Sequence, residues 1–363
     1  MTPRIVLFGA TGYTGRLLAE RLAGQGERPL LAGRSPERLA ALSVALDGLE
    51  WRVADIERAA SVQSLVGPGD VLVSTVGPFM KWGEPAVRAV IAAGATYLDS
   101  TGEPAFIRRV FEAHGPQAER AGATLLPAMG YDFVPGALAG ALVLRDAGPA
   151  AVRVDVGYYV LGAGAGALSR GTRASLAGAA LGPGFAFRDG RLRAARPAER
   201  VRAFDGRAAV SVGGAEHFGL PAAHPGLREV NVYLGWFGPL ARPVQVLTRL
   251  GTAAGRVPGV TALLRAGGER LAGLGALPEP GTTSAARSWV AAAAYDRAGA
   301  QLAELRLAGP DPYDLTAGLL AWAARRALLE RLAARGAVGP LTAFGLDALE
   351  QGCAEAGLER TAE

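Results

Sequence analysis

The stretch Gly9-Ala10-Thr11-Gly12-Tyr13-Thr14-Gly15 lies between an apolar run at residues 4–8 and a helical pattern at residues 15–23. We expect Gly9 to permit a tight turn out of a strand and Gly12 to let the backbone approach a pyrophosphate. Gly15 would let the helix pack closely on the sheet, while the helix N-terminus offers N–H groups and a positive dipole end. In this strand–turn–helix context, the whole stretch is predicted to contact a dinucleotide cofactor.

Strand-like and helix-like segments alternate around this stretch through the first 130 residues. Such β-α-β repetition predicts an α/β fold of the Rossmann type, a doubly wound parallel sheet, because parallel strands need crossover connections. Strands are expected at residues 4–8, 29–32, 51–54, 70–76, 96–100 and 124–127, and helices at 15–23, 36–46, 84–93 and 104–120.

The pattern then changes to an α+β domain with a mostly antiparallel sheet. Strands are expected at residues 152–161, 228–236, 288–295 and 301–307. Residues 187–192 are predicted to form a hairpin, because Asp189-Gly190 supplies the positive φ angles of a type I′ turn. Helices are expected within 239–277, at 315–334 and at 341–356. This divides the chain into a Rossmann domain (1–130), an α+β substrate or dimerisation domain (131–310), and C-terminal helices (311–363) that pack back on the first domain.

The end of the second strand favours NADP(H) over NAD(H). An NAD site usually has Asp or Glu there, whereas an arginine can meet the 2′-phosphate of NADP. Here Arg34 supplies a charge, Ser35 a hydroxyl group, and Arg38 follows one helical turn later. The alternative is that Arg34 is an ordinary surface residue of an arginine-rich protein.

Two further segments are expected at the cofactor. Asp55 follows the third strand and is placed either to reach the adenine amino group or to cap the next helix. Thr75, Val76, Gly77 and Pro78 follow the fourth strand, at the carboxyl edge where nicotinamide lies in doubly wound sheets.

Composition narrows the class of protein. The 363 residues suit two domains, and a hydrophobic fraction of one half excludes a disordered chain. One cysteine, Cys353, excludes an internal disulfide and a cysteine-based zinc site, and with three histidines we expect no metal site.

The net charge of +5 does not indicate nucleic-acid binding, because the basic residues are dispersed and form no run. No signal segment or membrane-spanning stretch is expected, so the sequence predicts a cytoplasmic protein. Apolar helices in the second half make a homodimer reasonable.

Several motifs along the chain resemble the saccharopine dehydrogenase-like oxidoreductase family. They are residues 75–103 (TVGPFMKWGEPAVRAVIAAGATYLDSTGE), 130–136 (GYDFVPG), 169–172 with Ser175, Glu216-His217, 309–313 (GPDPY) and 339–343 (GPLTA). Within the family the chain is most similar to the bacterial branch that contains trans-acting enoyl reductases of polyketide-lipid assembly. The resemblance implies an NADP(H)-dependent reductase that transfers hydride in a cleft between a Rossmann domain and a substrate domain.

On this resemblance Tyr131 and Asp132 are the candidate catalytic residues, with Tyr131 as proton donor and Asp132 orienting it or binding substrate. Asp132 could equally be a turn or cap residue. Lys81, Arg170 and Thr172 are candidate contacts to a small-molecule or carrier-bound substrate. Reduction of an enoyl C=C bond is expected. A C=N reductase using Arg170 or Arg173, or a non-catalytic protein that binds NADPH, are the alternatives.

Overall fold

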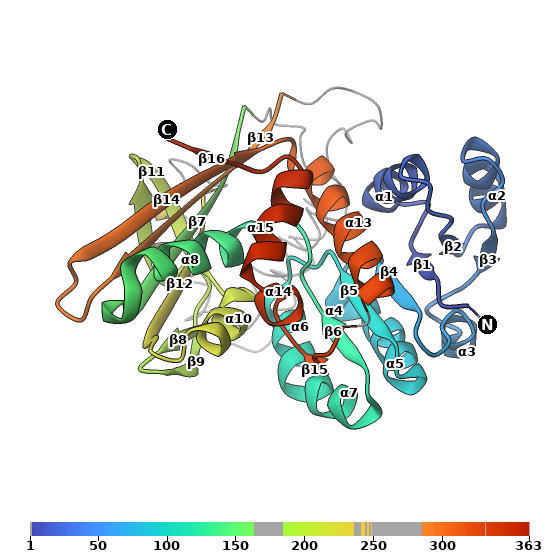
Figure 1. Ribbon diagram of the computed structural model, residues 1–363, viewed down its shortest axis with the longest axis horizontal. Helices are drawn as coiled ribbons and strands as arrows, with labels where there is room; N and C mark the ends of the chain where they lie inside the picture. Colours follow the sequence, from blue (N-terminus) through green and yellow to red (C-terminus); the bar gives the residue numbers. More distant parts are fainter. Residues whose placement is uncertain are drawn as a thin grey trace. The chain divides into compact units, whose positions relative to one another are not determined.

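The computed structural model describes residues 2–162, 184–235, 241–243, 245–246, 248, 285–330 and 332–362. The chain forms two compact units (Figure 1). The first contains Met1–Thr101, Phe106–Val134 and Tyr313–Gly357, and the second contains Gly102–Ala105, Pro135–Pro312 and Leu358–Glu363.

The first unit is built on a parallel sheet with the strand order β15-β6-β5-β4-β1-β2-β3. The strands are β1 (Ile5–Phe8), β2 (Leu30–Gly33), β3 (Trp51–Val53), β4 (Val71–Ser74), β5 (Thr96–Asp99), β6 (Thr124–Leu126) and β15 (Gly336–Ala337). In β1, β2 and β4 every residue is buried, as expected for strands with both faces covered. The order reverses between β1 and β4, so the chain turns that follow these two strands lie at the topological switch point.

Helices connect these strands and bury the sheet. They are α1 (Tyr13–Gly24), α2 (Pro36–Ala45), α3 (Ala59–Gln63), α4 (Phe79–Trp82), α5 (Glu84–Ala93), α6 (Pro104–Arg109) and α7 (Gly115–Ala121), with a π-helical turn, Val110–His114, between α6 and α7. One core cluster joins strand residues Val6, Leu72 and Tyr97 to Val87 of α5 and Phe106 of α6. The strands expected for this region and the helices expected at 15–23, 36–46 and 84–93 are present, with ends shifted by a few residues. The single helix expected at 104–120 is instead divided into α6, the π-helical turn and α7.

Three C-terminal helices belong to the first unit: α13 (Pro312–Glu330), α14 (Pro340–Phe344) and α15 (Leu346–Glu355). An ion pair of 3.0 Å joins Arg325 of α13 to Glu27, just after α1. The single helix expected at residues 341–356 was wrong, because Gly345, with φ of 81°, breaks it into α14 and α15. The helix expected at 315–334 starts earlier and ends at Glu330.

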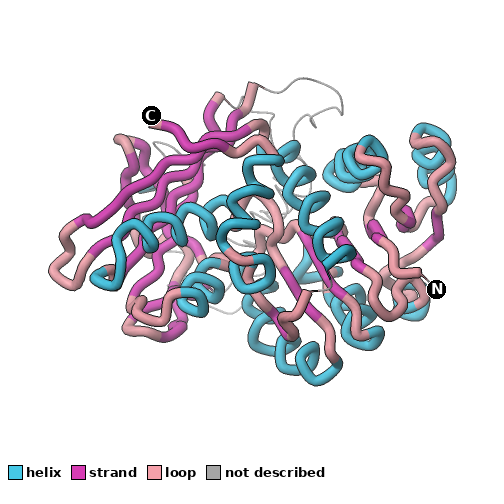
Figure 2. The backbone as a smooth tube through the Cα atoms, viewed as in Figure 1, coloured by secondary structure: helices cyan, strands magenta, loops and turns pink. Residues whose placement is uncertain are grey.

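The second unit is dominated by strands, drawn in magenta in Figure 2. Among the described residues the sheet runs β10-β11-β12-β7-β13-β14-β16, with β8 paired to β12 and β9. Its strands are β7 (Arg153–Leu161), β8 (Gly184–Arg188), β9 (Arg191–Ala195), β10 (Val201–Phe204), β11 (Arg207–Val212), β12 (Glu229–Leu234), β13 (Arg287–Tyr295), β14 (Gln301–Gly309) and β16 (Glu359–Thr361). Of these described pairings only β12 with β7 is parallel, so the prediction of a mostly antiparallel sheet is confirmed.

The second unit also contains α8 (Val134–Ala147), a 3₁₀ turn (Gly148–Ala150) and α10 (Glu216–Ala223). The phenol of Tyr158, on β7, donates a 2.5 Å hydrogen bond to Glu216 of α10. Gly136 of α8 lies so close that a Cβ atom there would be 1.9 Å from the Tyr158 hydroxyl oxygen. No helix in the described ranges is long and apolar enough to span a bilayer.

Candidate cofactor site and active site

The glycine-rich turn after β1 is held by backbone hydrogen bonds. The N–H groups of Gly9 and Ala10 donate to the carbonyl of Ala32 at the end of β2, at 2.9 and 3.1 Å. Gly9 has a φ of 93°, which non-glycine residues rarely adopt. The Gly12 N–H donates to the Gly9 carbonyl at 2.9 Å and closes the turn.

The turn also brings α1 against the end of β4. A Cβ atom on Gly15 would lie 2.2 Å from the Gly9 carbonyl oxygen and 2.9 Å from Oγ1 of Thr75. The Thr75 hydroxyl donates to the Gly9 carbonyl at 3.2 Å. No side chain caps the N-terminus of α1 at Gly12, so this helix end presents backbone and its positive dipole at the switch point.

The predicted 2′-phosphate corner follows β2. Arg34 is exposed, and its guanidinium makes no hydrogen bond or ion pair with the described residues. The Arg38 guanidinium donates to the carbonyl of Thr11 in the glycine-rich turn. Ser35 caps α2 by accepting from the Arg38 N–H at 3.3 Å, and it donates to Glu37 at 2.8 Å. The structure therefore leaves Arg34 available, whereas Ser35 and Arg38 already have partners.

Asp55 stands just beyond β3 and is partly buried. Its Oδ1 atom accepts the Glu57 N–H at 3.1 Å, and its backbone bonds to the Ser61 hydroxyl. The residue at the N-cap of α3 is Arg58, so the predicted alternative that Asp55 caps this helix is wrong. Its adenine contact stays a prediction.

The segment after β4 contains the predicted nicotinamide contacts Thr75 to Pro78, all partly buried. It leads into α4, where the exposed Lys81 ammonium lies 4.9 Å from the centroid of the Trp82 ring. Lys81 therefore already has a cation–π partner, and its role as a substrate contact stays a prediction.

Tyr131 and Asp132 lie at the end of the first unit, just before α8. Tyr131 is 2% exposed, and its N–H donates to the Thr316 hydroxyl of α13 at 3.0 Å. Asp132 has a buried Oδ1 atom that accepts no hydrogen bond, so this oxygen caps no helix. Burial raises the pKa of Asp132 to about 7. A carboxyl group that is half protonated near neutral pH can donate or accept a proton.

Sequence reasoning gave no role to Tyr313 and Thr316, both on α13. The Tyr313 ring contacts the ring of Tyr13 edge-on, with centroids 4.9 Å apart. Tyr313 thereby supports the glycine-rich turn, and Thr316 holds the segment that carries Tyr131. The only available signal was the GPDPY motif, which ends at Tyr313.

The other predicted substrate contacts, Arg170 and Thr172, lie outside the described residues, as does Arg173. So does most of the expected helical stretch at 239–277. Within the described residues no group of three His, Cys, Asp or Glu side chains is arranged to hold a metal ion.

The parallel sheet, the glycine-rich turn at its switch point and the bare helix end define a dinucleotide-binding domain of the Rossmann type. Residues 5–126 match the family model of the saccharopine dehydrogenase NADP binding domain.

Relatives and solved structures extend the comparison. A Mycobacterium tuberculosis protein, provisionally named a trans-acting enoyl reductase, is 42% identical over 146 residues, which are 38% of this chain and 35% of that protein. The trans-acting enoyl reductase of Mycobacterium leprae is 40% identical over 140 residues, 37% of this chain and 34% of that one. The matched segment thus spans about a third of the length of these relatives. Apo saccharopine dehydrogenase (L-Glu forming) of Saccharomyces cerevisiae shares the fold, with a TM-score of 0.60, 13% identity and 99% coverage of both chains.

Proposed function

We propose that this protein is an NADPH-dependent reductase that delivers hydride to an activated double bond, namely the enoyl group of a lipid or polyketide intermediate. The observation that carries the proposal is the end of β2. At the end of β2, an NAD site would have a carboxylate. In this chain, which matches an NADP-binding domain, the charged group at that place is the guanidinium of Arg34, and it has no partner among the described residues.

The residues present fit the dinucleotide. A Cβ atom on Gly9 would clash with the Thr75 side chain, and one on Gly15 with the Gly9 carbonyl, so these two glycines let the turn pack against α1 and the end of β4. A Cβ atom on Gly12 would meet only the Gly9 carbonyl oxygen, at 3.3 Å, so Gly12 is the position where backbone can approach a pyrophosphate. The turn and the N-terminus of α1 would hold the pyrophosphate, Arg34 the 2′-phosphate, and the segment from Thr75 to Pro78 the nicotinamide. Bound NADPH supplies the hydride.

Hydride addition to the β-carbon of an enoyl thioester must be matched by a proton at the α-carbon, while NADPH becomes NADP⁺. Asp132 is the best proton source among the described residues, because its Oδ1 atom is buried and accepts no hydrogen bond, and its pKa is about 7. Tyr131 is the second candidate. The enoyl assignment itself rests on the names of the relatives, which match over 146 and 140 residues of this chain.

The test begins with fluorescence titrations of wild type and Arg34→Ala with NADPH and NADH. We expect NADPH to bind more tightly, and Arg34→Ala to weaken NADPH binding by about ten-fold or more while leaving NADH binding unchanged. Arg120→Ala is the matched control, because this exposed arginine lies in the last turn of α7, which leads into the amino end of β6 and not into the carboxyl end of a strand. Equal affinity for both nucleotides would contradict the cofactor assignment.

The second step measures NADPH oxidation with a 2-enoyl thioester and with a cyclic imine. Turnover of the thioester alone supports the proposal. Turnover of the imine alone would assign the C=N chemistry, and tight NADPH binding without turnover of either would assign a non-catalytic protein.

A further inference from the structure

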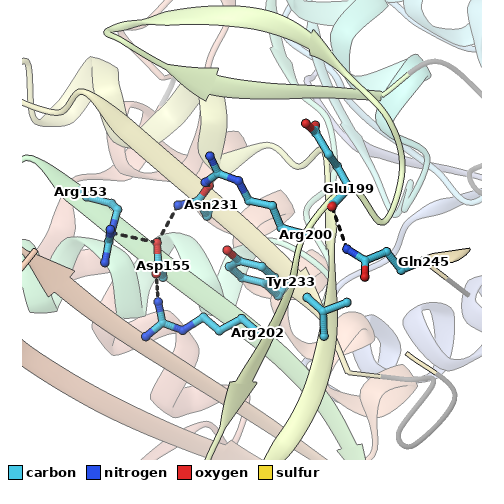
Figure 3. Close-up of a pocket in the computed structure, with 9 residues that line it drawn as sticks. Arg153, Asp155, Glu199, Arg200, Arg202, Asn231, Tyr233 and Gln245 are labelled. Atoms are coloured by element: carbon cyan, nitrogen blue, oxygen red, sulfur yellow. Dashed lines mark hydrogen bonds and ion pairs between the residues drawn. The ribbon is translucent and has the colours of Figure 1, made fainter. Parts of the chain in front are cut away.

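The second unit contains a polar pocket of about 460 Å³ on its sheet, separate from every residue considered above (Figure 3). Its wall is formed by Arg153 on β7, Arg202 on β10, Tyr233 on β12, and Arg200 just before β10. The volume is in the range of sites for small organic molecules.

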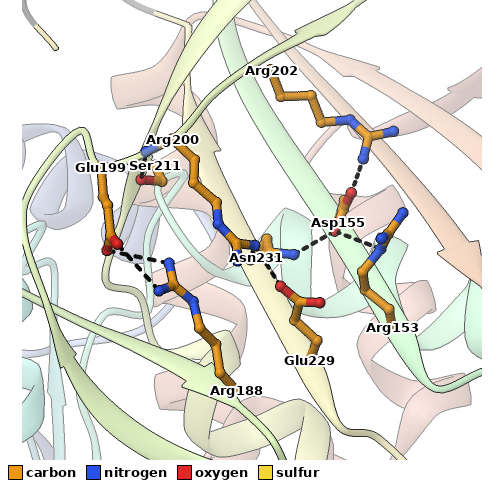
Figure 4. Close-up of polar contacts among 9 residues, drawn as sticks. All are labelled: Arg153, Asp155, Arg188, Glu199, Arg200, Arg202, Ser211, Glu229 and Asn231. Atoms are coloured by element: carbon orange, nitrogen blue, oxygen red, sulfur yellow. Dashed lines mark hydrogen bonds and ion pairs between the residues drawn. The ribbon is translucent and has the colours of Figure 1, made fainter. Parts of the chain in front are cut away.

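The carboxylates of this region are already neutralised (Figure 4). Asp155 is 2% exposed, accepts from the Asn231 amide at 2.7 Å, and forms ion pairs with Arg202 and, at 3.6 Å, with Arg153. The two guanidinium partners compensate the burial of this carboxylate, which in turn keeps both arginines in place.

The two remaining carboxylates are likewise occupied. Glu199 forms two hydrogen bonds with Arg188, at 3.3 and 3.2 Å. Glu229 is paired at 2.5 Å with one terminal nitrogen of Arg200, which also donates to Asn231, and the other terminal nitrogen of Arg200 makes no hydrogen bond with the described residues. Around the pocket the arginines 153, 188, 200 and 202 face the acidic residues 155, 199 and 229, which leaves one excess positive charge.

Several donors at the pocket have no acceptor among the described residues. The terminal nitrogens of Arg153 make no hydrogen bond there, and its guanidinium stacks on the Tyr295 ring at 4.0 Å. The phenol of Tyr233, which is 4% exposed, also has no hydrogen-bond partner in that part of the chain. Burial raises the pKa of Tyr233, so its hydroxyl group stays protonated. To donate a hydrogen bond, this hydroxyl needs an acceptor from outside the described residues.

We propose that this pocket binds an oxyanion, a phosphate or carboxylate group carried by a small organic molecule, with Arg153, Arg200 and Tyr233 as the donors. A planar guanidinium fork matches both groups by paired hydrogen bonds, and the ring of Tyr233 gives the organic part an apolar surface. The inference does not depend on the proposed reductase activity.

The experiment is isothermal titration of the intact chain with inorganic phosphate and, in a second arm, with succinate at the same ionic strength. We expect saturable binding in at least one arm, which identifies the group. Arg200→Gln should weaken it by about ten-fold or more, and Tyr233→Phe by about five-fold, since one hydrogen bond to a charged group is lost. Arg193→Gln is the matched control, because Arg193 is ion-paired to Asp189 on the β8–β9 hairpin and does not line the pocket.

Tyr233→Phe keeps the ring that packs against Phe204, so it tests the donor without removing the packing. Binding that is absent in both arms, or that Arg193→Gln weakens as much as Arg200→Gln does, would overturn the proposal. So would binding that is lost in Arg34→Ala and retained in Arg200→Gln, because the anion would then occupy the first unit.

Discussion

Replacing Gly15 by alanine is expected to destabilise the first unit and to weaken NADPH binding. The new Cβ atom would lie 2.2 Å from the Gly9 carbonyl oxygen, about 1 Å inside an ordinary carbon–oxygen contact of about 3.3 Å. The obstructing atom is backbone and cannot rotate away, so α1 or the turn must shift. Overpacking of this kind costs about 1–3 kcal/mol, and the gain in helix propensity returns up to about 1 kcal/mol. We therefore expect a net loss of up to about 3 kcal/mol.

The same helix provides the matched control. Gly24 is its last residue, and a Cβ atom there meets nothing within 4 Å, so Gly24→Ala should be neutral or stabilise by up to about 1 kcal/mol. Urea unfolding followed by circular dichroism gives the two free energies, and fluorescence titration gives the affinity for NADPH. If Gly15→Ala unfolds at the same urea concentration as Gly24→Ala and binds NADPH like wild type, the close approach of α1 to the turn does not govern this site.

Three further predictions concern buried groups. The pKa of Asp132 is raised to about 7, so its contribution to stability is present below about pH 4 and is lost as the pH rises through 7. Asp132→Asn should therefore remove the fall in thermal stability over this pH range, and an unchanged pH dependence in the variant would be evidence against the raised pKa. Burial lowers the pKa of His217 to about 4, so the stability that this residue contributes above about pH 6.5 is lost as the pH falls through 4. In His217→Gln the stability of the second unit should depend less on pH in this acidic range, and an acid sensitivity equal to that of wild type would contradict this prediction. Gly136→Ala would place a Cβ atom 1.9 Å from the Tyr158 hydroxyl, and we expect a loss of about 1–3 kcal/mol in urea unfolding, whereas a wild-type curve would refute the clash.

Local turn chemistry explains which parts of the fold were predictable. Asp189-Gly190 was recognised as a hairpin turn, and both residues have positive φ angles, 53° and 75°. Asp205-Gly206 has the same signal and joins β10 to β11 with φ angles of 47° and 75°, yet these two strands were not predicted. Their sequences VRAF and RAAVSV mix arginine and alanine, which are weak strand formers, so only the pairing with β12 makes the assignment clear.

The candidate site was predictable only where its residues are close in sequence. The glycine-rich turn could be placed because a strand and a helix flank it directly. The contact between Tyr13 and Tyr313 joins residues 300 positions apart, and no periodic pattern indicates such a pair. The burial of Asp132 likewise depends on tertiary packing, so its raised pKa could not be inferred from the motif that contains it.

The end of β2 shows why discrimination between the two nucleotides should depend on one side chain. Sequence reasoning assigned the 2′-phosphate to Arg34 and Ser35, with Arg38 as a further candidate. In the structure the Ser35 hydroxyl caps α2 and bonds to Glu37, and the Arg38 guanidinium holds the Thr11 carbonyl. Removing either of these would disturb the helix start or the turn, and so would weaken binding of both nucleotides. Arg34 supports neither, so its loss should affect only the nucleotide that carries the 2′-phosphate.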